Sequence, residues 1–151
     1  GMPLVCACEE GRFEDVKLFI TCMKGINSNM TLREHVNQVG KSRYGVEWTP
    51  LMIAARYEHF QVVKYLIEQG EADPNIAQGG GVNALHFAAR NNRTNTELIE
   101  LLLTHMSLDS INKKNTWGGT PLDFAYECND SPIQQKIIDL IRSKGGKRWN
   151  E

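Results

Sequence analysis

The sequence has little that would place it in a membrane or on a nucleic acid. Its longest uninterrupted aliphatic run is residues 51–55, whereas a membrane-spanning helix needs about 20 apolar residues. Its 17 Lys and Arg are balanced by 18 Asp and Glu, and a nucleic-acid-binding protein needs a strongly basic surface. No basic segment followed by an apolar one opens the chain, so no secretory signal is visible. We therefore expect an intracellular protein, cytoplasmic or nuclear, with no membrane insertion and no nucleic-acid partner.

Cysteine is also scarce. Cys6, Cys8, Cys22 and Cys128 are too few and too unevenly spaced for a secreted disulfide scaffold. One residue separates Cys6 from Cys8, whereas paired zinc ligands are usually about two to four residues apart. We expect reduced thiols and no metal site.

The chain lacks the sets of residues that catalysis would need. Residues 40–42 (Gly-Lys-Ser) match the end of a phosphate-binding loop, but such a loop has an earlier glycine where this chain has His35. Glu9 and Glu10 are adjacent acids, which on a helix point about 100° apart and not at one substrate. The sequence therefore predicts no enzyme, no catalytic residues and no cofactor.

What the sequence does contain is an internal repeat. Residues 49–51 (Thr-Pro-Leu) recur 34 residues later as 83–85 (Asn-Ala-Leu) and a further 37 residues on as 120–122 (Thr-Pro-Leu). Each start is followed by a pair that begins with alanine and then by an apolar block with helical spacing. Thr49, Asn83 and Thr120 can cap a helix, and proline or alanine suits the first helical position. An earlier, degenerate unit has the same order of signals: Met2-Pro3-Leu4, Ala7-Cys8, Gly11, Val16 and Phe19-Ile20. The sequence therefore predicts two short helices in each unit of one domain, residues 2–150, with units at about 2–23, 47–76, 79–112 and 115–145.

The segment between the first two units, residues 24–46, is an insertion. Thr31 and Glu34 form a capping-box pattern, which predicts a short helix near 31–38. Ser131 predicts a similar start for the last helix, whose polar residues would form the outer face of a terminal cap: Gln134, Gln135, Lys136, Asp139 and Arg142. Gly70 and Gly145 follow helices at positions that suit a left-handed residue.

These motifs resemble the ankyrin repeat family, whose pattern is Thr-Pro-Leu-His-x-Ala-Ala, a Gly-His pair, a Val-Val-x-x-Leu-Leu helix and Gly-Ala-Asp-Val-Asn. The residues that carry the resemblance are Thr49-Pro50-Leu51, Ala54-Ala55, His59, Val62-Val63, Leu66-Ile67, Gly70, Ala72-Asp73, Asn75, Leu85-His86, Ala88-Ala89, Leu98-Ile99, Leu102-Leu103, Gly118, Thr120-Pro121-Leu122 and Ala125. The resemblance implies an all-α solenoid of about four stacked helix-turn-helix units with short turn hairpins between them. The family histidine is kept only as His86, which leaves its hydrogen bond near the helix start open in the units of Val5, Met52 and Asp123.

The resemblance also implies a function: binding another protein through turn tips and exposed positions of the first helices. Carried over to this chain, the partner-binding candidates are Trp48, Arg56, Tyr57, Arg90, Asn91, Trp117 and Glu127. We expect Arg56 and Arg90 to lie one repeat apart and to favour an acidic, partly apolar partner, with Glu9, Glu10 and Glu127 exposed to set its register. Two alternatives stay open. The face can be a merely solvated surface, with Trp48 packed on the insertion, or the chain can be a regulatory or targeting domain of a larger enzyme or channel.

Overall fold

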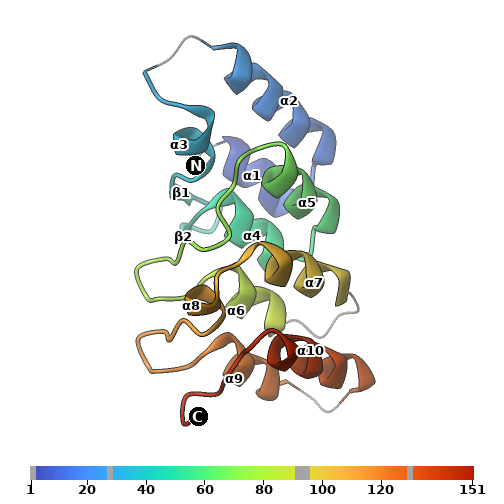
Figure 1. Ribbon diagram of the computed structural model, residues 1–151. Coiled ribbons are helices and arrows are strands. Elements are labelled where there is room, and N and C mark those ends of the chain that lie inside the picture. The colour runs from blue at the N-terminus through green and yellow to red at the C-terminus, as the bar shows by residue number, and fades with distance from the viewer. Residues whose placement is uncertain (1–2, 27–28, 91–95, 129–130) are drawn as a thin grey trace. The chain divides into compact units, whose positions relative to one another are not determined.

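The computed structural model describes residues 3–26, 29–90, 96–128 and 131–151, and these are mainly helical (Figure 1). The contacts divide the chain into two compact units, residues 1–73 (unit 1) and 74–151 (unit 2). The elements of unit 1 are α1 (Pro3–Glu10), α2 (Phe13–Gly25), α3 (Leu32–Val36), β1 (Gly40–Lys41), β2 (Glu47–Trp48), α4 (Pro50–Arg56) and α5 (Phe60–Glu68). Those of unit 2 are α6 (Ala84–Ala89), α7 (Thr96–His105), α8 (Leu108–Ile111), α9 (Pro121–Tyr126) and α10 (Pro132–Ser143). The all-α prediction is confirmed, because the only strands in the described ranges are the two short ones of unit 1.

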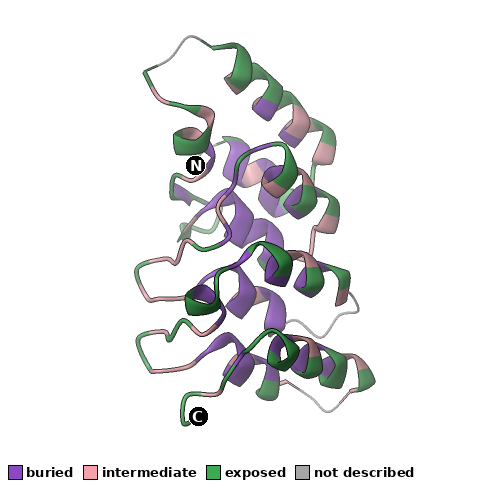
Figure 2. Ribbon diagram, in the orientation of Figure 1, coloured by how far each residue is buried: buried purple, intermediate pink, exposed green. Residues whose placement is uncertain are grey.

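Unit 1 contains two helix pairs. Helix α1 packs against α2 and α4, and α5 packs against α4 and α2. The small pairs 7–8 on α1 and 54–55 on α4 are completely buried, because short side chains allow close approach of neighbouring helices. Val62, Val63 and Leu66 form the buried stripe of α5, as the spacing predicts, and Figure 2 shows α4 buried along most of its length.

Unit 2 repeats this arrangement. Helix α6 packs against α7 and α9, and α10 packs against α7 and α9. The predicted stripe Leu98, Ile99, Leu102 and Leu103 is buried on α7. In the described residues of both units, no helix has the length and apolar character that a membrane span needs.

The predicted caps position the first helices. Thr49 Oγ1 accepts a hydrogen bond from Met52 N, Thr120 Oγ1 from Asp123 N, and Asn83 Oδ1 from Leu85 N and His86 N. Ser131 caps α10 by accepting from Gln134 N at 3.0 Å. Each cap satisfies backbone donors that a helix start leaves free, so these local predictions are confirmed.

The described part of the insertion, residues 24–26 and 29–46, contains a short helix and a short strand. Thr31 and Glu34 form the predicted capping box at the start of α3. The strands β1 and β2 then pair antiparallel, Gly40 with Trp48 and Lys41 with Glu47, so a hairpin that the sequence did not predict begins inside the insertion. Asn37 Oδ1 accepts from Asp73 N at 2.7 Å, which ties the insertion to the end of unit 1.

One glycine prediction is wrong. The left-handed residue after α5 is Glu71, with φ of 58°, and not Gly70. Gly70 is required for a different reason: a Cβ there would lie 2.9 Å from Leu66 O and 3.3 Å from Ile20 Cδ1. Gly145, with φ of 89°, has the predicted left-handed conformation.

Candidate protein-binding surface

The unit 1 candidates lie at the end of α4 and in the hairpin. Trp48 is half-buried on β2, and Arg56 is exposed with its guanidinium 5.8 Å from the centre of the Tyr57 ring. Tyr57 in turn stacks on His59, with ring centres 6.4 Å apart. The structure thus groups Arg56 with Tyr57 as an exposed cation–aromatic pair, a combination common at interfaces.

The acidic pair at the end of α1 differs from the prediction. Glu9 is only 7% exposed, because the loop between β1 and β2 covers it: Arg43 N donates to Glu9 Oε2 at 3.4 Å. Arg43 also forms an ion pair with Glu10, and His59 Nε2 contacts Glu9 O at 3.0 Å. The expectation that Glu9 and Glu10 are both free to repel a partner's acids is therefore wrong, since this hairpin engages them.

In unit 2, the tip formed by residues 115–119 is a tightly hydrogen-bonded turn. Asn115 Oδ1 accepts from Trp117 N at 3.0 Å and from Gly119 N at 2.8 Å. Gly118 has φ of 84°, a conformation that favours glycine. This turn leaves the Trp117 side chain 90% exposed, so a large apolar group is presented to solvent on a fixed backbone.

Arg90 and Glu127 lie together at the ends of α6 and α9. Arg90 is 3.8 Å from Glu127 Oε2, and its guanidinium lies 5.6 Å from the centre of the Phe124 ring. The Cys128 thiol donates to Arg90 O at 2.7 Å, and burial raises the pKa of this thiol. Asn91, the remaining unit 2 candidate, lies outside the described residues.

A hollow of about 440 Å³ lies between the 115–119 turn and the end of α9. Its walls include the aromatic residues Trp117, Phe124, Tyr126 and Trp149, with Asp123, Glu127 and Arg148 as the charged groups. Trp149 is 59% exposed. Two of the predicted candidates, Trp117 and Glu127, thus line one concavity, and Arg90 is ion-paired to its edge.

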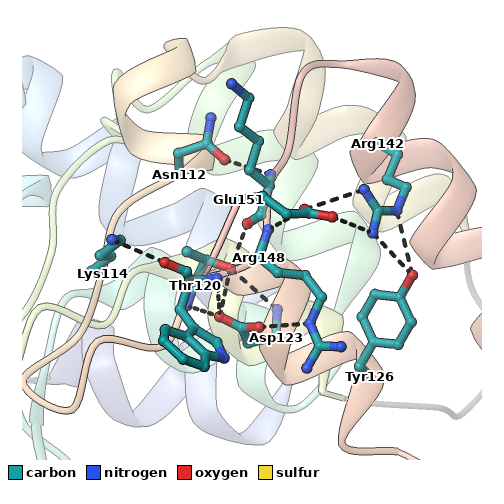
Figure 3. Close-up of polar contacts among 10 residues, drawn as sticks. Asn112, Lys114, Thr120, Asp123, Tyr126, Arg142, Arg148 and Glu151 are labelled. Atoms are coloured by element: carbon teal, nitrogen blue, oxygen red, sulfur yellow. Dashed lines mark hydrogen bonds and ion pairs between the residues drawn. The ribbon is translucent and has the colours of Figure 1, made fainter.

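The segment 147–151 completes the hollow, and Asp123 holds it (Figure 3). Asp123 Oδ1 accepts from Arg148 Nε at 2.9 Å, and Oδ2 accepts from Trp149 N at 2.9 Å and from Thr120 N at 3.0 Å. Burial alone would raise the pKa of Asp123, but the hydrogen bonds from Thr120, Arg148 and Trp149 together lower it below 3.8. The carboxylate is therefore ionised at neutral pH and fixes the segment against α9.

Tyr126 is clamped between two arginines. The Arg148 guanidinium lies 4.5 Å from the centre of the Tyr126 ring, and Arg142 Nη2 donates to Tyr126 Oη at 3.2 Å. Arg142 also bonds Glu151 Oε1 at 3.1 Å, as Figure 3 shows. These bonds to Tyr126 and Glu151 raise the pKa of Arg142, and bonds from Arg148 N and Arg142 lower the pKa of Glu151.

Asp123 also makes the hydrogen bond near the helix start that His86 makes in the preceding repeat. His86 Nδ1 accepts from Asn83 N at 3.1 Å, and its Nε2 lies 3.2 Å from Gly119 O. Burial lowers the pKa of His86 to about 4, so the ring is neutral. Asp123 takes the same place in the next repeat by accepting from Thr120 N. The helix-start bond is therefore retained in that unit.

Another correction concerns the predicted outer face of α10. Gln134 is 2% exposed, and its Nε2 donates to Ala89 O at 3.1 Å and to Ala125 O at 2.6 Å. It therefore joins the ends of α6 and α9 to α10 and is no part of the solvent face. The other four residues named for that face, Gln135, Lys136, Asp139 and Arg142, are exposed.

Sequence reasoning missed Phe124, Tyr126, Arg148 and Trp149. The first two flank Ala125 in the repeat, and their aromatic character was a usable signal. Segment 147–151 follows the last repeat, so no repeat register could assign its place.

The described residues contain no cluster of three or more metal-ligating side chains, and burial raises the pKa of the Cys8 thiol. The surface combines aromatic walls, paired charges and a hydrogen-bonded backbone.

Comparison with known proteins identifies the repeat. The family described as "Ankyrin repeats (many copies)" matches residues 51–103. Zinc finger CCCH domain-containing protein 47 of Arabidopsis thaliana is 31% identical over 129 residues, which is 82% of this chain and 22% of that protein. The putative ankyrin repeat protein FPV031 of fowlpox virus (strain NVSL) is 29% identical over 92% of this chain and 34% of its own length.

A cation channel is also similar. Transient receptor potential cation channel subfamily A member 1 of Homo sapiens is 27% identical over 97% of this chain and 11% of its own length. The chain thus spans between a tenth and about a third of the length of these three curated relatives.

Proposed function

The chain belongs to the ankyrin repeat family, and on that premise we propose that it is a non-enzymatic module that binds a partner protein through the hollow of unit 2. Ankyrin repeats are generally protein-interaction modules. One observation carries the choice of surface: Trp117 is 90% exposed beside a concavity whose other walls include Phe124, Tyr126 and Trp149. Exposed aromatic side chains around a hollow are typical anchors of interfaces.

The charged candidates have supporting roles in this proposal. Arg90 and Glu127 form an ion pair at the edge of the hollow, where such a pair affects specificity more than affinity. In unit 1, Trp48, Arg56 and Tyr57 provide a second contact region, because the exposed Arg56 is presented on the face of Tyr57.

The test is capture of proteins from an extract of the source cells, measured by quantitative mass spectrometry. We expect Trp117→Ala to lose most of the enriched proteins, because it removes the most exposed anchor. Leu18→Ala is the matched control, since it removes a 62% exposed apolar side chain from α2 of unit 1, outside both proposed contact regions. An unchanged set of captured proteins with both Trp117→Ala and Trp149→Ala would contradict the proposal.

The alternative is a regulatory or targeting region of a larger enzyme or channel. The observation that favours it is the range of relatives, which includes a cation channel and, over 61% of this chain, the NAD-dependent deacetylase sir2B of Dictyostelium discoideum. The length of the native gene product distinguishes the two proposals.

A further inference from the structure

Two basic segments lie side by side next to the hollow of unit 2. Residues 112–114 and 144–149 are joined by three hydrogen bonds: Asn112 Nδ2 to Gly145 O (3.0 Å), Lys147 N to Asn112 Oδ1 (2.7 Å) and Lys114 Nζ to Trp149 O (3.3 Å). Figure 3 shows Asn112 and Lys114 on one side of the second segment. The tertiary structure therefore gathers lysines that are about 30 residues apart in the sequence.

We name these side chains the lysine patch: Lys113, Lys114, Lys144 and Lys147. All four are exposed, and none of them has a carboxylate oxygen within 4.0 Å in the described part of the chain. The sequence contains no Asp or Glu between residues 110 and 122 or between 140 and 150. The patch therefore keeps an uncompensated positive charge.

The hollow beside the patch has no such excess. Asp123 is bonded to Arg148, and Glu127 lies 3.8 Å from Arg90. The exposed uncharged side chains of the hollow are chiefly those of Trp117 and Trp149. Residues 114 and 147 directly precede lining residues 115 and 148, so the two segments that carry the patch adjoin the hollow with its aromatic side chains. Such a surface combines an apolar anchor site with attraction for negative charge.

We propose that the partner of this surface is an acidic linear peptide segment, in which an aromatic or large aliphatic side chain fills the hollow and neighbouring carboxylates face the lysine patch. This inference rests on the proposed function and adds the chemistry of the partner. A protein partner is favoured over a nucleic acid because the whole chain carries a net charge of −1, whereas nucleic-acid domains are strongly basic overall. In unit 2 it also moves the expected acid-binding cation from Arg90 to the lysine patch, because Arg90 is already paired with Glu127.

The test compares two labelled peptides of about 12 residues on the full chain, by fluorescence anisotropy at about 50 and 300 mM NaCl. Both have a central Trp-Leu pair; one has glutamates on each side and the other has glutamines in their places. We expect the glutamate peptide to bind about tenfold more tightly at low salt and to lose this advantage at high salt, because exposed charge pairs are screened.

Variants locate the site. Lys113→Gln with Lys147→Gln should remove most of the advantage of the glutamate peptide, while Trp117→Ala should weaken both peptides. Lys136→Gln is the matched control, because Lys136 is an exposed lysine of the same unit beside Glu100 and Asp139. Loss of the advantage in this control as well would overturn the assignment to the lysine patch.

Other results overturn the inference itself. Equal binding of the two peptides, binding of neither, or tighter binding of a single-stranded oligothymidylate of the same length would exclude an acidic peptide partner. The proposed function is judged separately by capture from cell extract. If Trp117→Ala abolishes capture while Lys113→Gln with Lys147→Gln leaves it unchanged, the binding function stands and the acidic partner is excluded.

Discussion

Arg148 Nε donates a hydrogen bond to Asp123 Oδ1 at 2.9 Å, across 25 residues of sequence. Asp123 is mostly buried on the first helix of the last repeat, and Arg148 comes from the segment that follows the last helix. This bond fixes Arg148 over the ring of Tyr126. A single carboxylate thus links the stability of the last repeat to the shape of the candidate surface.

Replacement of this carboxylate should destabilise unit 2. Asp123→Asn keeps the shape but loses the charge and one acceptor, and bonds to charged groups contribute about 1.5 to 3 kcal/mol each. We expect a loss of about 2 kcal/mol in the free energy of unfolding, measured by urea denaturation at pH 7.

The contribution of Asp123 should also depend on pH. The pKa of Asp123 is lowered in the folded state, so its stabilising effect is present above pH 3.8 and decreases as the pH falls through the lower pKa of the folded state. The gap between the two proteins should narrow there. Glu127→Gln, at an exposed carboxylate, should have little effect, and a large one would contradict this account.

Because His86 is neutral in the folded protein, the free energy of unfolding should also depend on pH at higher values than those for Asp123. Burial lowers the pKa of His86 from 6.5 to about 4, so the unfolded chain binds a proton that the folded chain does not between these values. The contribution of neutral His86 to the free energy of unfolding is fully present above pH 6.5, and it should fall by about 3 kcal/mol as the pH drops to 4. His86→Gln should flatten the dependence of unfolding free energy on pH in this range. His105→Gln, at an exposed histidine, should keep the slope of the wild-type protein, and an equal slope in His86→Gln would refute the prediction.

Gln134 should contribute more to stability than its neighbour. Its Nε2 donates to Ala89 O and Ala125 O in a buried position, and removal leaves two carbonyl groups without this donor. We expect Gln134→Ala to cost about 1 to 3 kcal/mol in chemical denaturation. The adjacent Gln135→Ala loses only an exposed bond to Asp139 and should cost less than about 0.5 kcal/mol. Equal losses of stability in the two variants would contradict a stabilising role for the two buried hydrogen bonds of Gln134.

The turn after α5 predicts opposite effects at adjacent positions. Glu71 has φ of 58°, and a side chain in this conformation costs about 1 kcal/mol or more. Glu71→Gly should therefore raise the melting temperature, with a gain of up to about 1 kcal/mol after the greater flexibility of the unfolded chain is counted. Gly70→Ala should lower it, because the new Cβ would lie 2.9 Å from Leu66 O. Gln69→Gly is the control and should also destabilise, since Gln69 is in the right-handed helical region. A stabilising Gly70→Ala would exclude the close approach seen there.

Features that depend on neighbouring residues were predictable from the sequence. The caps at Thr49, Asn83, Thr120 and Ser131 follow from a side chain that reaches a backbone N–H two or three positions on. The buried stripe of α7 follows from helical spacing, and the recurrence of both signals carries the resemblance to the ankyrin repeat family.

The burial of the remaining polar groups and the position of the hollow depend on how the helices pack. Glu9 is covered by Arg43, 34 residues away, and Gln134 reaches Ala89, 45 residues away. Segment 147–151 has no repeat register, and Asp123 places it beside Trp117 and Tyr126. Such contacts leave no periodic signal, because they depend on how separate helices pack and not on the spacing within any one of them.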